Sequence, residues 1–112
     1  MKIAIPLVNG VLSSHFGHCD RFAIITADPA SKKILSKEEK NPPPHEPGLY
    51  PSWLANLGIT HVIAGGMGES AINLFVQNHI EVIAGVSGDT PEKIAQHFLK
   101  NTLVTGNNYC TH

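Results

Sequence analysis

Residues 61–84 read HVIAGGMGESAINLFVQNHIEVIA, and this stretch decides the fold. His61–Ala64 and Glu81–Ala84 are short apolar runs, and each is typical of a buried strand. Between them, residues 69–78 repeat apolar side chains at every third or fourth position, which predicts a helix with one face against a sheet. A strand, a helix and a strand in this order require a right-handed crossover and parallel strands. The second half of the chain is therefore predicted to be α/β.

The first half of the chain is expected to add an antiparallel pair to this sheet. Lys2–Leu7 is a nearly continuous apolar run, typical of a central strand that is covered on both faces. Phe22–Thr26 is rich in β-forming residues, and the charges of Lys33–Glu39 suit a solvated edge strand. The turn residues Asp28–Ser31 lie between them and predict a hairpin. The sheet is therefore predicted to be mixed, with helices on both faces.

The remaining segments are expected to be connections and helices. Val8–Asp20 is predicted to be a long loop, and Asn41–Pro51, which contains five prolines, an extended linker. Ser52–Leu57 is expected to form a short helix that stops at Gly58. Thr90-Pro91 combines an N-cap residue with a proline at the first helical position, which predicts the start of the last helix.

The composition predicts one domain and excludes two classes of partner. The chain has 112 residues, of which 42% are hydrophobic, and its formal net charge is -1. We expect a single domain over residues 1–112, with a flexible tail at 102–112. With no basic excess and no apolar run long enough to span a membrane, neither nucleic acid nor a membrane is an expected partner. The start of the chain does not resemble a signal peptide, so we expect a cytoplasmic protein, as a monomer or weak homodimer.

A binding site is expected where two loops meet at one end of the sheet. Ligands of open α/β sheets bind beyond the carboxyl ends of the strands, where the order of the strands reverses. This point is predicted between the first strand and the strand at 61–64, so the loops at residues 13–19 and 65–68 should lie together. His15, His18 and Cys19 place nitrogen and sulfur donors within the first loop. Such donors suit zinc, copper, iron or an iron-sulfur cluster.

The same loop also has a purely structural interpretation. Phe16 can pack inward and Gly17 can permit a tight turn, which leaves the two histidines as solvated loop residues. Further donors lie at a distance in the sequence: His45 in the proline-rich linker, and Cys110 and His112 in the tail. The tail donors join a site at the strand ends only if the chain after the last helix folds back over them.

The glycine loop and Cys19 suggest two alternative functions. Residues 66–71 match the pattern G-x-G-x-x-A between a strand and a helix, so Gly65–Gly68 could form a phosphate- or nucleotide-binding regulatory module. The chain is too short for the two halves of a dinucleotide-binding fold, and an anionic cluster suits the loop equally well. Cys19, with His15 or His18 as base, could serve a cysteine-dependent hydrolase or transferase.

The order of these motifs resembles the dinitrogenase iron-molybdenum cofactor biosynthesis accessory family. The resemblance rests on Ser14–Cys19 with Phe22 after it, and on Gly58-Ile59 ahead of a strand that ends in Ala64–Gly68. It spans nearly the whole chain. It implies a three-layer α/β/α sandwich with a five-stranded mixed sheet and a ribonuclease-H-like motif, which agrees with the strand and helix order given above.

The resemblance also implies a function and a set of site residues. Members of the family bind, store or carry an iron-sulfur or molybdenum-containing cluster, and they pass it from donor to acceptor proteins. We therefore expect a cofactor carrier rather than an enzyme. By position, the cofactor-binding residues are His15, Phe16, Gly17, His18, Gly65, Gly66 and Gly68. The candidate metal ligands are His15, Cys19, His45, Cys110 and His112.

Overall fold

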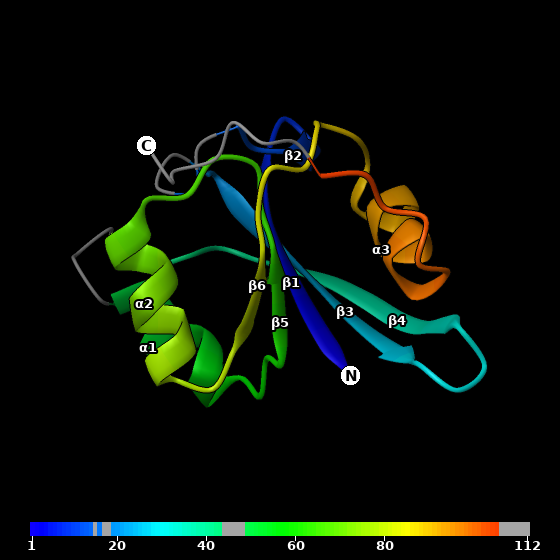
Figure 1. Ribbon diagram of the computed structural model, residues 1–112, viewed down its shortest axis with the longest axis horizontal. Helices are drawn as coiled ribbons and strands as arrows, with labels where there is room; N and C mark the ends of the chain where they lie inside the picture. Colours follow the sequence, from blue (N-terminus) through cyan, green and yellow to red (C-terminus); the bar gives the residue numbers. More distant parts are fainter. Residues whose placement is uncertain (15, 17–18, 44–48, 106–112) are drawn as a thin grey trace.

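The computed structural model describes residues 1–14, 16, 19–43 and 49–105, and it shows six strands and three helices in this part of the chain (Figure 1). In chain order these are β1 (Lys2–Val8), β2 (Val11–Leu12), β3 (Arg21–Asp28), β4 (Lys33–Lys40), α1 (Leu49–Asn56), β5 (His61–Ile63), α2 (Glu69–Gln77), β6 (Glu81–Ile83) and α3 (Pro91–Leu99).

The strand order confirms the predicted mixed sheet. The strands lie in the order β4-β3-β1-β5-β6, and β2 pairs with β1 off this path. The β3–β4 hairpin is antiparallel to β1, whereas β5 and β6 run parallel to it. The reversal of order therefore falls between β1 and β5, as the sequence predicts.

The prediction of five strands and of a continuous loop at Val8–Asp20 is wrong by one short strand. Asn9 and Gly10 both have positive φ angles, 54° and 84°, and they connect β1 to the two-residue strand β2. Two such residues between paired strands form the tight turn that matches the twist of a hairpin. The Asn-Gly pair is a strong hairpin signal, so this sixth strand was detectable from the sequence.

Side chains of β1 alternate between two apolar clusters, one on each face of the sheet. Ile3 and Ile5 pack in a cluster with Ile94 of α3. Ala4 points to the opposite cluster, which contains Leu54 of α1 and Phe75 of α2. The alternation follows from the two-residue period of a strand. Helices α1 and α2 therefore cover one face of the sheet and α3 covers the other (Figure 1).

Helix α1 begins earlier than the sequence predicts. The linker was expected to continue to Pro51 and the helix to start at Ser52, but the helix starts at Leu49. Pro51 is the third helical residue, where the amide that proline lacks has no partner within the helix anyway. The start of α3 agrees with the prediction, since the Thr90 side chain accepts a hydrogen bond from the Lys93 amide.

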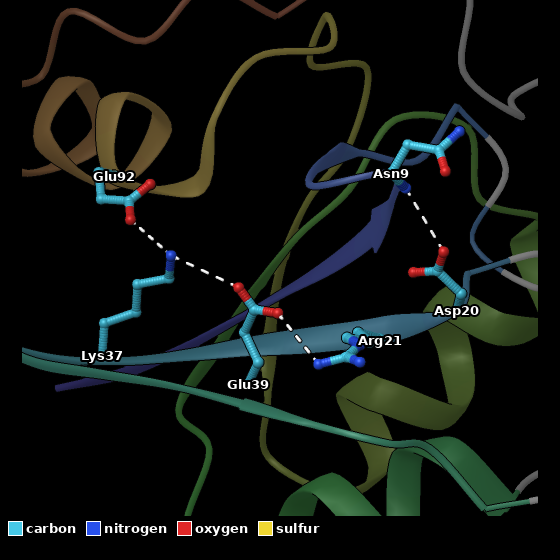
Figure 2. Close-up of polar contacts among 6 residues, drawn as sticks. All are labelled: Asn9, Asp20, Arg21, Lys37, Glu39 and Glu92. Atoms are coloured by element: carbon cyan, nitrogen blue, oxygen red, sulfur yellow. Dashed lines mark hydrogen bonds and ion pairs between the residues drawn. The ribbon is translucent and has the colours of Figure 1, made fainter.

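A chain of ion pairs joins the edge strand β4 to α3 (Figure 2). Lys37 Nζ lies 2.5 Å from Glu92 Oε2 and 3.5 Å from Glu39 Oε2, and Arg21 lies 3.7 Å from the other oxygen of Glu39. The Lys37–Glu92 hydrogen bond raises the pKa of the lysine and lowers that of the glutamate. Because these charges are on the surface, they add little stability, but they keep the exposed strand β4 polar.

In the described part of the chain, no helix has the length and apolar character that crossing a membrane requires.

The side chain of His61 makes three contacts with neighbouring side chains. Its Nδ1 lies 2.7 Å from Thr60 Oγ1, and its Nε2 lies 3.5 Å from Glu81 Oε2. Its ring also packs against Phe98 of α3, with centroids 5.5 Å apart. Burial lowers the pKa of His61, and the neighbouring Glu81 carboxylate opposes part of that shift. The folded protein therefore holds this proton less tightly than the unfolded chain does.

We predict that His61 makes the fold less stable in acid. As the pH falls through the ordinary histidine range, near about 6.5, the unfolded chain takes up a proton that the folded state resists, and the free energy of unfolding falls. His61→Gln should flatten this dependence, because glutamine takes up no proton in this pH range. Urea unfolding between pH 5 and pH 8 measures the difference. Identical pH profiles for His61→Gln and the parent would contradict it.

Candidate functional site

The candidate site lies where the chain leaves β1, β5 and β6 at one end of the sheet. Three segments meet there: the β2–β3 connection (residues 13–20), the β5–α2 loop (residues 64–68) and the β6–α3 loop (residues 84–90). Figure 1 shows this end of the sheet at the top of the view. In the β2–β3 connection, residues 15 and 17–18 lie outside the described part of the chain.

Main-chain hydrogen bonds hold these three segments together. The Gly66 amide donates to the Ser14 carbonyl oxygen at 2.8 Å, and the Gly66 carbonyl oxygen accepts from the Phe16 amide at 3.0 Å. On the other side, the Gly85 amide donates to the Gly65 carbonyl oxygen at 2.8 Å. The predicted meeting of the two loops is therefore confirmed for the residues that the structure describes.

Gly65 and Gly68 occupy opposite environments. A Cβ atom on Gly65 would lie 2.8 Å from the Ser13 carbonyl oxygen and 3.1 Å from Ser14 Cα, so this glycine is required by packing alone. A Cβ atom on Gly68 would have no neighbour within 4 Å among the described atoms. Gly68 also has φ -70° and ψ 157°, which any residue adopts readily. Neither packing nor conformation within the described protein therefore demands a glycine at position 68.

Gly68 also precedes the first turn of α2, whose amide groups have no partner within the helix. Its position is the N-cap, and within the described residues no side chain caps this end. The partial positive charge of the helix terminus favours a negative group nearby. As far as the described residues go, the glycine loop therefore offers backbone donors and open space at the same point.

Phe16 packs inward and anchors the β2–β3 connection, as the structural interpretation of this loop predicts. It is only 7% exposed. Its ring makes edge-to-face contacts with Phe22, Tyr50 and Phe75, with centroids 6.0, 5.8 and 5.3 Å apart. Such geometry is the favourable one for aromatic pairs. Phe16 thus fixes its own point of the β2–β3 connection to the core.

Cys19 is half-buried beside the same apolar cluster. Burial raises the pKa of its thiol to about 11, a backbone hydrogen bond opposes part of this shift, and the Asp20 carboxylate adds to it. Next to Cys19, the Asp20 amide donates to the Leu7 carbonyl oxygen. The Asp20 side chain accepts from the Asn9 amide (Figure 2). At neutral pH Cys19 is therefore a protonated thiol.

Sequence reasoning missed two residues of this region. Tyr50 is buried in α1 against Phe16, and burial raises the pKa of its phenol, with a further contribution from nearby Cys19. Met67 is buried within the glycine loop itself. Tyr50 and Leu54 are four positions apart, which is the spacing of one helix face. The predicted linker extends to Pro51 and therefore places Tyr50 outside the helix. For Met67, the sequence gives no comparable signal.

Most of the predicted site residues lie outside the described residues. His15, Gly17, His18, His45, Cys110 and His112 all belong to that part, so Cys19 is the one candidate metal ligand that the structure places. Within the described residues, no group of three His, Cys, Asp or Glu side chains lies close enough to hold a metal ion. What is described is therefore one thiol, the backbone amides at the start of α2, and the space at Gly68.

Comparison with known sequences identifies relatives of this chain. Residues 1–101 match the family model described as "Dinitrogenase iron-molybdenum cofactor". The "Uncharacterized protein MJ0580" of Methanocaldococcus jannaschii is 33% identical over 85 residues, which cover 73% of this chain and 72% of that protein.

Comparison with solved structures shows the same fold. The crystal structure of PH0822 superposes with a TM-score of 0.87 at 24% identity and covers 96% of both chains. The apo form of the orange protein from Desulfovibrio gigas superposes with a TM-score of 0.71 at 22% identity, over 95% of this chain and 92% of that one. At these identities the likeness concerns the fold alone.

We predict that alanine is tolerated at position 68 but not at position 65. Gly65→Ala should lower the free energy of unfolding by about 1–3 kcal/mol, because its Cβ meets backbone atoms that cannot turn away. Gly68→Ala should change it by less than about 0.5 kcal/mol, because its Cβ meets open space. Urea unfolding of the two variants beside the parent measures both values. Equal losses would show that the close approach at Gly65 is not a constraint.

We also predict slow alkylation of Cys19. A pKa of about 11, against an ordinary value of 9.0, lowers the thiolate fraction at neutral pH about a hundredfold. The rate with iodoacetamide, followed at Cys19 by mass spectrometry, should therefore be lower in the folded protein than in urea. A folded-state rate above that of a free small thiol would instead indicate an activated nucleophile and favour the enzyme alternative.

Proposed function

Because the chain belongs to the dinitrogenase iron-molybdenum cofactor family, we propose that it binds an iron-sulfur or molybdenum-containing cluster at the ends of β1 and β5. The cluster is cargo, received from one protein and passed to another. One observation carries the proposal: the hydrogen bonds that Gly66 exchanges with Ser14 and Phe16 join the donor-bearing connection to the open end of α2.

The chemistry of the described residues fits such a cargo. Sulfur-containing clusters carry negative charge, and the first turn of α2 supplies backbone donors with the partial positive charge of a helix terminus. Cys19 supplies a soft donor for iron or molybdenum once its proton leaves. The space that the described residues leave at Gly68 would let a bulky group approach the backbone, and a larger side chain at this position would occupy that space.

The state of Cys19 supports a carrier over a cysteine-dependent enzyme. A nucleophile needs a thiolate at neutral pH, and a positive neighbour usually stabilises it. Here burial and the Asp20 carboxylate both raise the thiol pKa. A metal ion displaces the thiol proton on binding, so a high pKa weakens the complex without preventing it.

We predict that cluster binding depends on Cys19 and Gly68 but not on His97. Cys19→Ala removes a donor, and Gly68→Val places a branched side chain in the proposed cluster space, so both should lower the amount of cluster bound. His97→Ala, on α3, should bind like the parent. The apo proteins are reconstituted anaerobically with iron and sulfide, or with thiomolybdate, and bound metal and sulfide are measured beside the visible absorption.

The pH dependence gives this experiment a second readout. If Cys19 releases one proton for each cluster bound, the affinity of the parent should rise with pH, by up to about tenfold per pH unit from this group. Cys19→Ala should lose that part of the slope. Urea unfolding of each variant separates loss of binding from loss of the fold. If folded Cys19→Ala and Gly68→Val retain the cluster as the parent does, the cargo binds elsewhere.

A further inference from the structure

His61 and Glu81 form a pair at the beginning of the strands β5 and β6. Each is the first residue of its strand, and the two are direct partners in the parallel register. Both strands begin at the lower end of the view in Figure 1, opposite the end that carries the candidate cluster site. His61 Nε2 lies 3.5 Å from Glu81 Oε2, and the Glu81 side chain is 68% exposed. Ions in solution can therefore reach the pair.

Two contacts within the protein hold the His61 ring in place. The ring packs against Phe98 of α3, with centroids 5.5 Å apart, and its Nδ1 lies 2.7 Å from Thr60 Oγ1. A hydrogen bond at the second ring nitrogen is the usual support of a metal-bound histidine, because it fixes the orientation of the ring. A ring that is already oriented loses little conformational freedom when a ligand binds.

The hydrogen bonds of Thr60 assign the proton of the neutral imidazole to Nδ1. The hydroxyl has one hydrogen, which it donates to the Lys2 carbonyl oxygen at 3.0 Å, so it acts as an acceptor towards His61. Nδ1 is then the donor, and Nε2 keeps its lone pair. The 3.5 Å between Nε2 and the Glu81 oxygen is also longer than an N–H···O hydrogen bond. Nε2 therefore faces the carboxylate without donating to it.

The distance between these two atoms matches that between neighbouring ligands of a metal ion. Zinc binds nitrogen and oxygen ligands at about 2.0–2.2 Å, which places two ligands of a tetrahedral site roughly 3.4 Å apart. His61 Nε2 and Glu81 Oε2 are 3.5 Å apart. An imidazole ligand suits zinc and its neighbours in the periodic table, whereas magnesium and calcium prefer oxygen ligands alone.

We propose that His61 Nε2 and Glu81 Oε2 together bind a divalent transition-metal ion such as zinc. Among the described residues no third His, Cys, Asp or Glu side chain completes the site, so water fills the remaining positions and the ion can exchange with solution. The pair shares no residue with the proposed cluster site and lies at the other end of the sheet. The outcome of its test is therefore independent of cluster binding.

NMR of the ¹⁵N-labelled protein without cluster, at about pH 7.5, tests the proposal during a titration with zinc. This pH is above the ordinary histidine pKa of about 6.5, so the ring carries one proton. Before zinc is added, the ring signals of His61 should show a protonated Nδ1 and an unprotonated Nε2. Zinc should then shift the Nε2 signal, together with the backbone amide signals of His61 and Glu81. The His61 ring signals are identified by their loss in His61→Gln, so zinc bound elsewhere on the chain does not affect the result.

Two glutamate variants separate ligation from net charge. Glu81→Gln removes the charged ligand, so the zinc concentration needed to shift the His61 signals should rise more than about tenfold. Glu38→Gln is the matched control, because it makes the same change of charge on the exposed strand β4. It should respond to zinc as the parent does. Urea unfolding of both variants beside the parent checks that they fold.

Three results would overturn the proposal. A protonated Nε2 in the absence of zinc would mean that this nitrogen donates to Glu81. His61 signals that keep their positions in excess zinc would show that no ion binds there. Equal weakening by Glu81→Gln and Glu38→Gln would attribute the response to net charge. If Glu81→Gln does not fold, the ring signals of the parent still decide between binding and its absence.

Discussion

Main-chain packing at Gly65 is the constraint on which the candidate site depends. The β2–β3 connection passes so close that a Cβ at this position would lie 2.8 Å from the Ser13 carbonyl oxygen. The Gly65 carbonyl oxygen, in turn, accepts the Gly85 amide. Three segments that follow three different strands therefore meet backbone to backbone. Because no flexible side chain separates them, these segments cannot be respaced by a change of side-chain rotamer at Gly65.

The aromatic cluster around Phe16 joins the β2–β3 connection to the core. Phe16 is buried against Phe22 of β3, Tyr50 of α1 and Phe75 of α2, so one ring joins the connection to three elements of the core. Cys19 packs against the same cluster. Its raised pKa is therefore a consequence of core packing, and a change in the cluster would alter the chemistry of the thiol as well as the stability of the fold.

The topology could be predicted from the sequence because periodicity and turn residues determine it locally. The apolar runs at β1, β5 and β6 and the hairpin turn after β3 lead to the observed strand order. The start of α1 differs from the prediction because Pro51 counts toward the proline-rich linker in the sequence, although proline is tolerated in the first helical turn. The burial of Cys19 and the different environments of Gly65 and Gly68 could not be predicted, since both depend on segments that meet only in the folded chain.

A carrier must release its cargo as well as bind it, and the burial of Cys19 bears on both steps. A thiolate stabilised by positive neighbours would hold a metal tightly and would react with other electrophiles. A thiol with a raised pKa stays protonated when the cargo is absent, and its proton competes with the metal for sulfur. Burial favours the protonated thiol over the thiolate. Under the proposed function, the free energy of this preference lowers the affinity for the cluster. Core packing around Phe16 and Cys19 would thus adjust how readily the cluster leaves, without any change in the residues that contact it.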